Sequence, residues 1–308
     1  IISIVCVFIL PKMFISYYGS AVNGLISSIT QFLGFISLCE CGVGAVVQSA
    51  LYKPLADKNN ILVSKIVISS KQFFRKVAYI LLVYTIILMI IYPFITIDSF
   101  DYIYTFILIF IISINFFTQY YFGVTYRLLL TADQLGFIQY SIHAITLILN
   151  MVCCIILMQN RISIHIVKLA TSLIFLLQPI LMYCIVKKKY KLNYSLVLDK
   201  EPIKQKWNGL FQHIAAVVLT NTDTIVLTLF STLESVSVYA VYHLVVNGVK
   251  TIIVSLTTGM QAMFGNMLAK NEMKELEESF DTMEWLLHTT ITLVFTIAGL
   301  LIIPFVNG

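Results

Sequence analysis

Long apolar runs separated by short polar stretches are the main pattern of this chain. A bilayer core of ~30 Å needs ~20 apolar residues per helix, and nine segments reach or approach that length. They cover residues 1–16, 22–50, 76–97, 102–125, 136–158, 164–186, 207–230, 236–268 and 284–305. Lipid admits only helices and closed barrels, and these runs are too long for barrel strands. The pattern predicts an all-α, polytopic transmembrane helical bundle.

Composition agrees with that pattern. Hydrophobic residues make up 59% of the 308 residues and charged residues 11%, against ~45–50% and ~25% in soluble domains. The chain opens inside an apolar run, IISIVCVFIL, and ends just after another. We therefore expect a fragment whose first helix is shortened and whose nine spans are a minimum.

Basic residues mark one side of the membrane. The loops after the second, fourth, sixth and eighth segments hold 16 of the 20 Lys and Arg residues, whereas the opposite loops hold only Arg161. Cytoplasmic loops carry such an excess in membrane proteins. The asymmetry predicts a cytoplasmic N-terminus and outer turns of about five residues.

The basic stretch 187–206, KKKYKLNYSLVLDKEPIKQK, is the clearest break in the chain. It predicts a cytoplasmic linker between a six-helix lobe, 1–186, and a partial three-helix lobe, 207–308. Two short stretches, 17–28 and 229–242, resemble each other: both are tight turns that lead into an over-long helix. Repeated bundles are a common design of secondary transporters.

The run TNTDTIVLTLF, residues 220–230, places Asp223 about seven residues from the end of an apolar segment. A carboxylate in hydrocarbon is costly and usually faces a bundle interior or a wet cavity. Asn221 and the threonines can hydrogen-bond it or the backbone. Two interpretations stay open: a polar cluster for helix packing, or a helix face that lines a hydrated cavity.

Other charged or titratable residues inside apolar runs are further candidates. Lys250 either extends its amine to the interface or lines the cavity, where it could pair with Asp223 or meet an anionic substrate. Arg127 could pair with Asp133 across a cytoplasmic turn or contact a phosphate. The remaining candidates are Lys12 for the cavity and, beside Asp223, Glu40 and His213 for a coupling ion.

Several functional classes find no support. The six cysteines lie in apolar runs without a CxxC pair, and there is no nucleotide loop, Ser/His/Asp set or metal-ligand spacing. We expect no cofactor, no bound metal, no nucleic-acid partner and no enzymatic activity.

Three stretches carry a resemblance to a known family: YYGSAVNGLISSITQFLGFISLCECGVGAVVQSALYK (17–53), YRLLLTADQLGFIQY (126–140) and NTDTIVLTLFSTLESVSVYAVYHLVVNGVKTII (221–253). With the helix pattern, the chain resembles the Wzx-type polysaccharide flippases of the superfamily that includes the multidrug and toxin extruders (MATE). The resemblance implies a twelve-helix, two-lobed transporter in the bacterial cytoplasmic membrane.

Such proteins move an undecaprenyl-pyrophosphate-linked oligosaccharide from the inner to the outer leaflet for O-antigen or capsule synthesis. The resemblance implies membrane lipids as surroundings, and polymerase and chain-length proteins of the same pathway as partners. Lys250, Lys12 and Arg127 would meet the family's expectation of a cationic cavity.

Three alternatives remain at this level. An ion-coupled exporter of small cationic compounds would share the fold, and Asp223 and Glu40 are compatible with it. A membrane polysaccharide polymerase would need a long outer loop with basic residues, which these 308 residues lack. A flippase for the cell-wall precursor is chemically almost the same as the favoured function.

Overall fold

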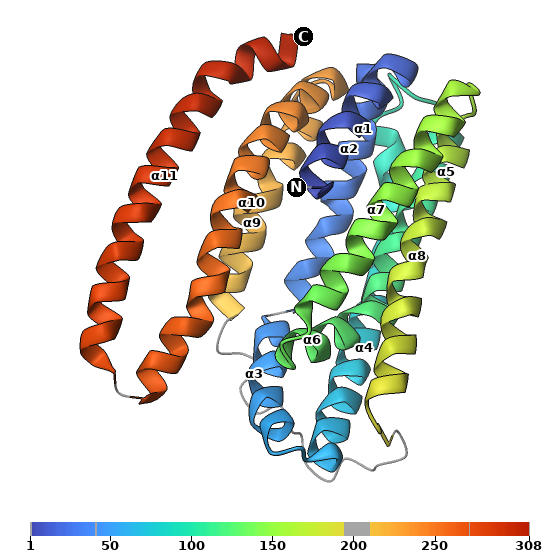
Figure 1. The fold of residues 1–308 in the computed structure, drawn as a ribbon. Helices are drawn as coiled ribbons and strands as arrows, with labels where there is room; N and C mark the ends of the chain where they lie inside the picture. Colours follow the sequence, from blue (N-terminus) through green and yellow to red (C-terminus); the bar gives the residue numbers. More distant parts are fainter. Residues whose placement is uncertain (1, 41, 194–209, 271, 308) are drawn as a thin grey trace. The chain divides into compact units, whose positions relative to one another are not determined.

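The chain folds into helices throughout. The structure is a computed structural model that describes residues 2–40, 42–193, 210–270 and 272–307, and all regular structure in these ranges is helical (Figure 1). Six segments of the described chain are long and apolar enough to cross a membrane: Ser20–Glu40, Asn60–Ile95, Tyr102–Ala132, Gly136–Gln159, Ile164–Lys189 and Met273–Pro304. The prediction of an all-α, multi-pass membrane bundle is confirmed.

Most of the predicted segments are helical, although several helices begin well before them. In order they are α1 (Ile2–Tyr18), α2 (Ser20–Gly34), η1 (Phe35–Glu40), α3 (Val43–Ala56), α4 (Asn60–Ile95), α5 (Tyr102–Thr118), η2 (Gln119–Gly123), α6 (Val124–Ala132), α7 (Gly136–Gln159), α8 (Ile164–Lys189), α9 (Leu210–Phe230), α10 (Leu233–Lys270) and α11 (Met273–Asn307). Residues 194–206 of the predicted linker, with 207–209 after it, lie outside the described residues.

One predicted segment is not a single helix. The apolar run 22–50 was expected to form one over-long span, and this is wrong. Helix α2 ends at Gly34, a 3₁₀ stretch continues to Glu40, and α3 begins after Gly42, whose φ is +69°. Glycine adopts this left-handed backbone without a Cβ penalty, so the chain can change direction here.

Part of the predicted basic loop after that segment is helical too. Asn59 caps α4 by accepting a hydrogen bond from the Leu62 amide at 3.1 Å. The helix has 36 residues, which at 1.5 Å each is ~54 Å, well beyond a ~30 Å hydrocarbon core. The basic first half of α4 therefore extends past the membrane interior on the side of the basic loops.

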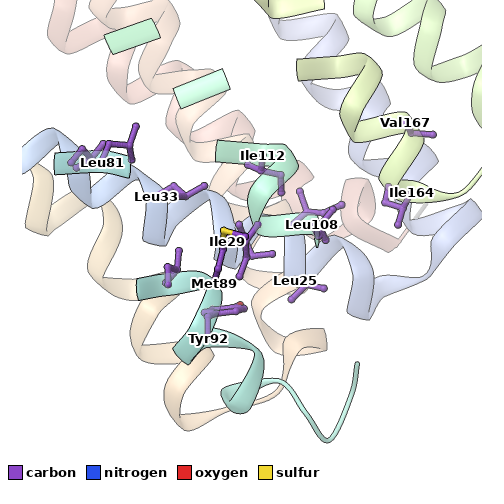
Figure 2. Close-up of a cluster of buried hydrophobic side chains, with 14 of the residues drawn as sticks. Leu25, Ile29, Leu33, Leu81, Met89, Tyr92, Leu108, Ile112, Ile164 and Val167 are labelled. Carbon is purple, nitrogen blue, oxygen red and sulfur yellow. The ribbon is translucent and has the colours of Figure 1, made fainter. Parts of the chain in front are cut away.

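Helix α2 supplies the centre of the main core. Leu25, Ile29 and Leu33 are fully buried, and Figure 2 shows them beside Tyr92 of α4 and Leu108 of α5. Lipid tails are as apolar as leucine, so close packing rather than transfer from water holds membrane helices together. Helix α2 makes such contacts with α1, α5 and α9.

The chain divides into two compact units, Ile1–Val236 and Ser237–Gly308. The first contains α1 to α9. In it α4 packs against α5, α7 packs against α8, and α5 packs against α8. The second contains most of α10 and all of α11. The expected division at the linker, into lobes 1–186 and 207–308, stays a prediction.

Candidate functional site

The polar residues of α9 pack against α2 within the first unit. Asn221 is buried and donates from Nδ2 to the Val217 carbonyl at 2.8 Å. Its Oδ1 lies so close to Gly34 that a Cβ built on Gly34 would stand 3.1 Å away. Glycine at position 34 thus lets the two helices approach, as small residues do at membrane helix contacts.

A chain of buried hydroxyl groups continues this contact. Tyr92 of α4 donates to Ser28 Oγ at 2.6 Å, Ser28 Oγ lies 2.7 Å from Thr228 Oγ1, and Thr228 is also 2.7 Å from the Thr224 carbonyl oxygen. Tyr92 and Ser28 are fully buried. We call Ser28, Gly34, Asn221 and Thr228 the α2–α9 seam.

The seam explains half of the polar run in α9. Asn221, Thr224 and Thr228 recur at helical spacing and are buried, whereas Asp223 is exposed. The packing interpretation therefore fits the amide and two threonines. The cavity interpretation of Asp223 stays a prediction.

Glu40 meets a tyrosine from another span. Tyr120 of η2 donates to Glu40 Oε1 at 2.6 Å, and the Arg127 guanidinium is close enough to act electrostatically on Tyr120. These three residues come from η1, η2 and α6. Glu40 and Arg127 were predicted for different roles, yet both act on Tyr120, one by a hydrogen bond and the other by its charge. The apolar pattern does not distinguish Tyr120 from its neighbours.

The ion pair expected between Arg127 and Asp133 does not form. The two residues lie six positions apart around the end of α6, so they occupy different sides of the helix. Asp133 instead pairs with Lys189 Nζ at 3.8 Å and accepts a hydrogen bond from the Tyr190 hydroxyl. This contact ties the turn after α6 to the end of α8.

Burial, together with the Asp133 carboxylate, raises the pKa of Tyr190 above the ordinary tyrosine value of 10. The protonated phenol is favoured in the fold, so its contribution is complete below pH 10 and declines as the pH rises further. We expect Tyr190→Phe to unfold at a lower temperature than the unaltered chain at pH 7–9. The difference should shrink above pH 10, and a constant difference across pH 7–11 would contradict this.

A second polar network was missed from the sequence. Gln178 of α8 donates to Thr146 Oγ1 at 2.7 Å, lies 3.0 Å from His143 Nδ1, and accepts from Gln119 at 3.3 Å. We call Gln119, His143, Thr146 and Gln178 the π-helix cluster, because Gln119 opens the π-helical turn η2. Amides inside apolar runs, as in FFTQYYFG and LLQPIL, were the available signal.

The remaining candidates belong to three different helices. Lys12 is exposed on α1, and Lys250 is exposed on α10. His213 lies in α9, but its side chain is outside the described residues. A pair between Lys250 and Asp223 therefore stays a prediction.

Comparison with known proteins adds no further constraint. No protein-family model, no curated protein and no solved structure matches this chain. Within the described ranges, His, Cys, Asp and Glu side chains nowhere form a group of three that could hold a metal ion.

Proposed function

We propose that this chain is a flippase that moves a polyprenyl-pyrophosphate-linked oligosaccharide across a bacterial cytoplasmic membrane. The physical need is clear: a pyrophosphate and several sugars cannot enter lipid, where each unsatisfied polar group costs several kcal/mol. A hydrated gap between two helix bundles removes that cost, while the prenyl tail stays in lipid.

One observation carries the proposal: the first helix after the linker, α9, joins the first bundle through a small, polar seam. Seam residues Ser28 and Thr228 lie nearest the short turns at 19 and 231–232, the predicted outer side. A contact of glycine, amide and hydroxyl groups can be exchanged for water at less cost than a tight apolar one. The seam is thus suited to open and close as the bundles rock.

Under this proposal the polar groups take different parts. Lys250 meets the anionic head group, with Arg127 and Lys12 as further cations along the route. Asp223, Glu40 and His213 are the candidates for sensing a coupling ion, and Glu40 already has a hydrogen-bond partner in Tyr120.

Locking the seam should stop transport. In a background without the six native cysteines, Ser28→Cys/Thr228→Cys should form a disulfide on oxidation, because the native hydroxyl oxygens lie 2.7 Å apart. We expect the oxidised protein to stop supplying lipid-linked glycan to the outer leaflet. Reduction should restore flipping, measured in reconstituted vesicles containing the full-length protein.

The matched control is Ser70→Cys/Thr125→Cys. These two hydroxyls are also buried and lie 3.3 Å apart, but they join α4 to α6 within residues 1–186. Cross-linking this pair should leave flipping nearly unchanged. Normal flipping by the oxidised 28–228 protein would overturn the rocking mechanism, and export of small cations instead of lipid-linked glycan would favour the exporter.

A further inference from the structure

Arg75 of α4 stands out among the charged groups of the first unit. Its guanidinium lies 4.8 Å from the centroid of the Tyr121 ring, and its Nε is buried without a hydrogen-bond partner in the part of the chain that the structure describes. A guanidinium has five N–H donors and cannot lose its charge in a protein. Arg75 as a whole is only partly buried, so the other N–H groups of the guanidinium can meet an anion from the surface.

Aromatic rings build the walls around this cation. Tyr121 stacks on Phe117 at 5.5 Å and meets Tyr79 edge-on at 6.1 Å. Tyr79 lies four residues after Arg75 on α4, so both occupy one face of that helix. We call Arg75, Tyr79 and Tyr121 the Arg75 site.

Depth places the site at a membrane interface. Arg75 precedes the end of α4 at Ile95 by about 20 residues, or ~30 Å of helix, which is the thickness of the hydrocarbon core. Tyr121 lies a similar ~28 Å from the start of α5 at Tyr102. Both estimates put the site at the head-group level on the side of the basic loops.

The surface next to the site faces outward and is apolar. Tyr79 is 56% exposed and Phe122 49%, and the rest of α4 toward Ile95 presents a row of exposed aliphatic side chains, Ile80, Val83, Ile87, Ile90 and Ile91. The acyl chains of a lipid whose head group lies at Arg75 would thus lie against this apolar surface. A ligand bound inside the helix bundle would not contact it.

Charge favours an anion here. No Asp or Glu occurs between Lys58 and Ile97, or between Tyr102 and Ala132, so α4, α5, η2 and α6 offer Arg75 no carboxylate. The 3₁₀ stretch η1, which also packs against α4, carries Glu40, and this carboxylate accepts a hydrogen bond from Tyr120. Lys71 lies one turn before Arg75 on the same helix, and its positive charge interacts with that of Arg75. Basic pockets between membrane helices on the cytoplasmic side bind anionic head groups.

We propose that the Arg75 site binds the phosphate of an anionic phospholipid from the leaflet that faces the basic loops. The guanidinium donates to the phosphate oxygens, the Tyr121 ring holds its plane, and the acyl chains lie along α4. The proposal does not depend on flipping, since it concerns a lipid held at the outside of the first bundle.

The test is native mass spectrometry of the full-length protein in detergent, titrated with phosphatidylglycerol or with phosphatidylcholine. We expect tighter binding of phosphatidylglycerol, and we expect Arg75→Gln to weaken it about 10-fold because charge-assisted hydrogen bonds are lost. Arg75→Lys keeps the positive charge but loses the planar group that stacks on Tyr121. Its affinity for phosphatidylglycerol should therefore lie between that of the unaltered protein and that of Arg75→Gln. Arg75→Lys also serves as the second variant if Arg75→Gln does not fold.

Lys76→Gln is the matched control. Lys76 is the next residue, exposed and at the same depth, but turned ~100° around the helix, so its loss should change binding by no more than about 2-fold. Equal binding of the two lipids, or equal losses for Arg75→Gln and Lys76→Gln, would overturn the proposal. Polyprenyl phosphate that displaces phosphatidylglycerol at lower concentration would also overturn it, because the occupant would then be the carrier lipid.

Discussion

Replacing Gln178 by leucine is expected to lower the free energy of unfolding by ~2–4 kcal/mol. The Gln178 amide serves three partners at once: Thr146 Oγ1, His143 Nδ1 and the amide of Gln119. Leucine fills a similar volume but leaves all three groups without this partner in a buried layer. A half-satisfied polar network is worse than an apolar one, so the loss should exceed that of a single hydrogen bond.

The measurement is reversible unfolding of the purified protein in mixed micelles. Gln72→Leu is the control, because it makes the same chemical change at an exposed position on α4. We expect that control to alter the unfolding free energy by less than ~0.5 kcal/mol. Similar losses for the two variants would mean that the π-helix cluster contributes nothing beyond general polarity.

Enlarging Gly34 should have the second largest effect, because it acts on the α2–α9 seam. A Cβ at this position would lie 3.1 Å from Asn221 Oδ1, and the further carbons of leucine have to displace the amide. We expect Gly34→Leu to lower the unfolding free energy by ~1–3 kcal/mol through overpacking. The shift of α9 should also reduce disulfide formation by the Ser28→Cys/Thr228→Cys pair.

A graded comparison isolates the seam from general strain. Gly34→Ala should lower the free energy of unfolding and the disulfide yield by smaller amounts, since the Asn221 amide has to move by only a few tenths of an ångström. Gly44→Ala is its control: a Cβ there meets Leu128 Cδ2 at an ordinary 3.7 Å. If Gly34→Ala left both stability and disulfide yield at the level of Gly44→Ala, the close contact with Asn221 would have no energetic role.

Much of the fold could be predicted because lipid restricts the options so strongly. Apolar runs in a bilayer must become helices, and the helices from α4 to α8 cover the predicted segments between 76 and 186, apart from the last two residues of 76–97. The break at Gly42 was missed because Cys39, Gly42 and Gly44 are as apolar or small as their neighbours. A hydropathy profile records only the composition along the chain. A glycine in the left-handed region changes the direction of the backbone without changing that composition.

The candidate site was less accessible from the sequence. Asp223 and Lys250 stand out in the sequence because charge is rare in such runs, and both are exposed in the structure, so their roles stay predictions. Tyr120, Gln178 and Arg75 were overlooked or treated only as loop residues. Their importance lies in partners 32 to 80 positions away, and a single sequence without tertiary contacts cannot show which amide meets which hydroxyl.

The π-helical turn at Gln119–Gly123 has a consequence for the whole Tyr102–Ala132 span. Such a turn holds one residue more than an α-helical turn of the same kind, and one residue corresponds to ~100° of rotation. Deleting a residue here would swivel α6 and Arg127 while leaving the far half of the span in place. The orientation of the basic end is therefore set by local winding, separately from the packing of the opposite end.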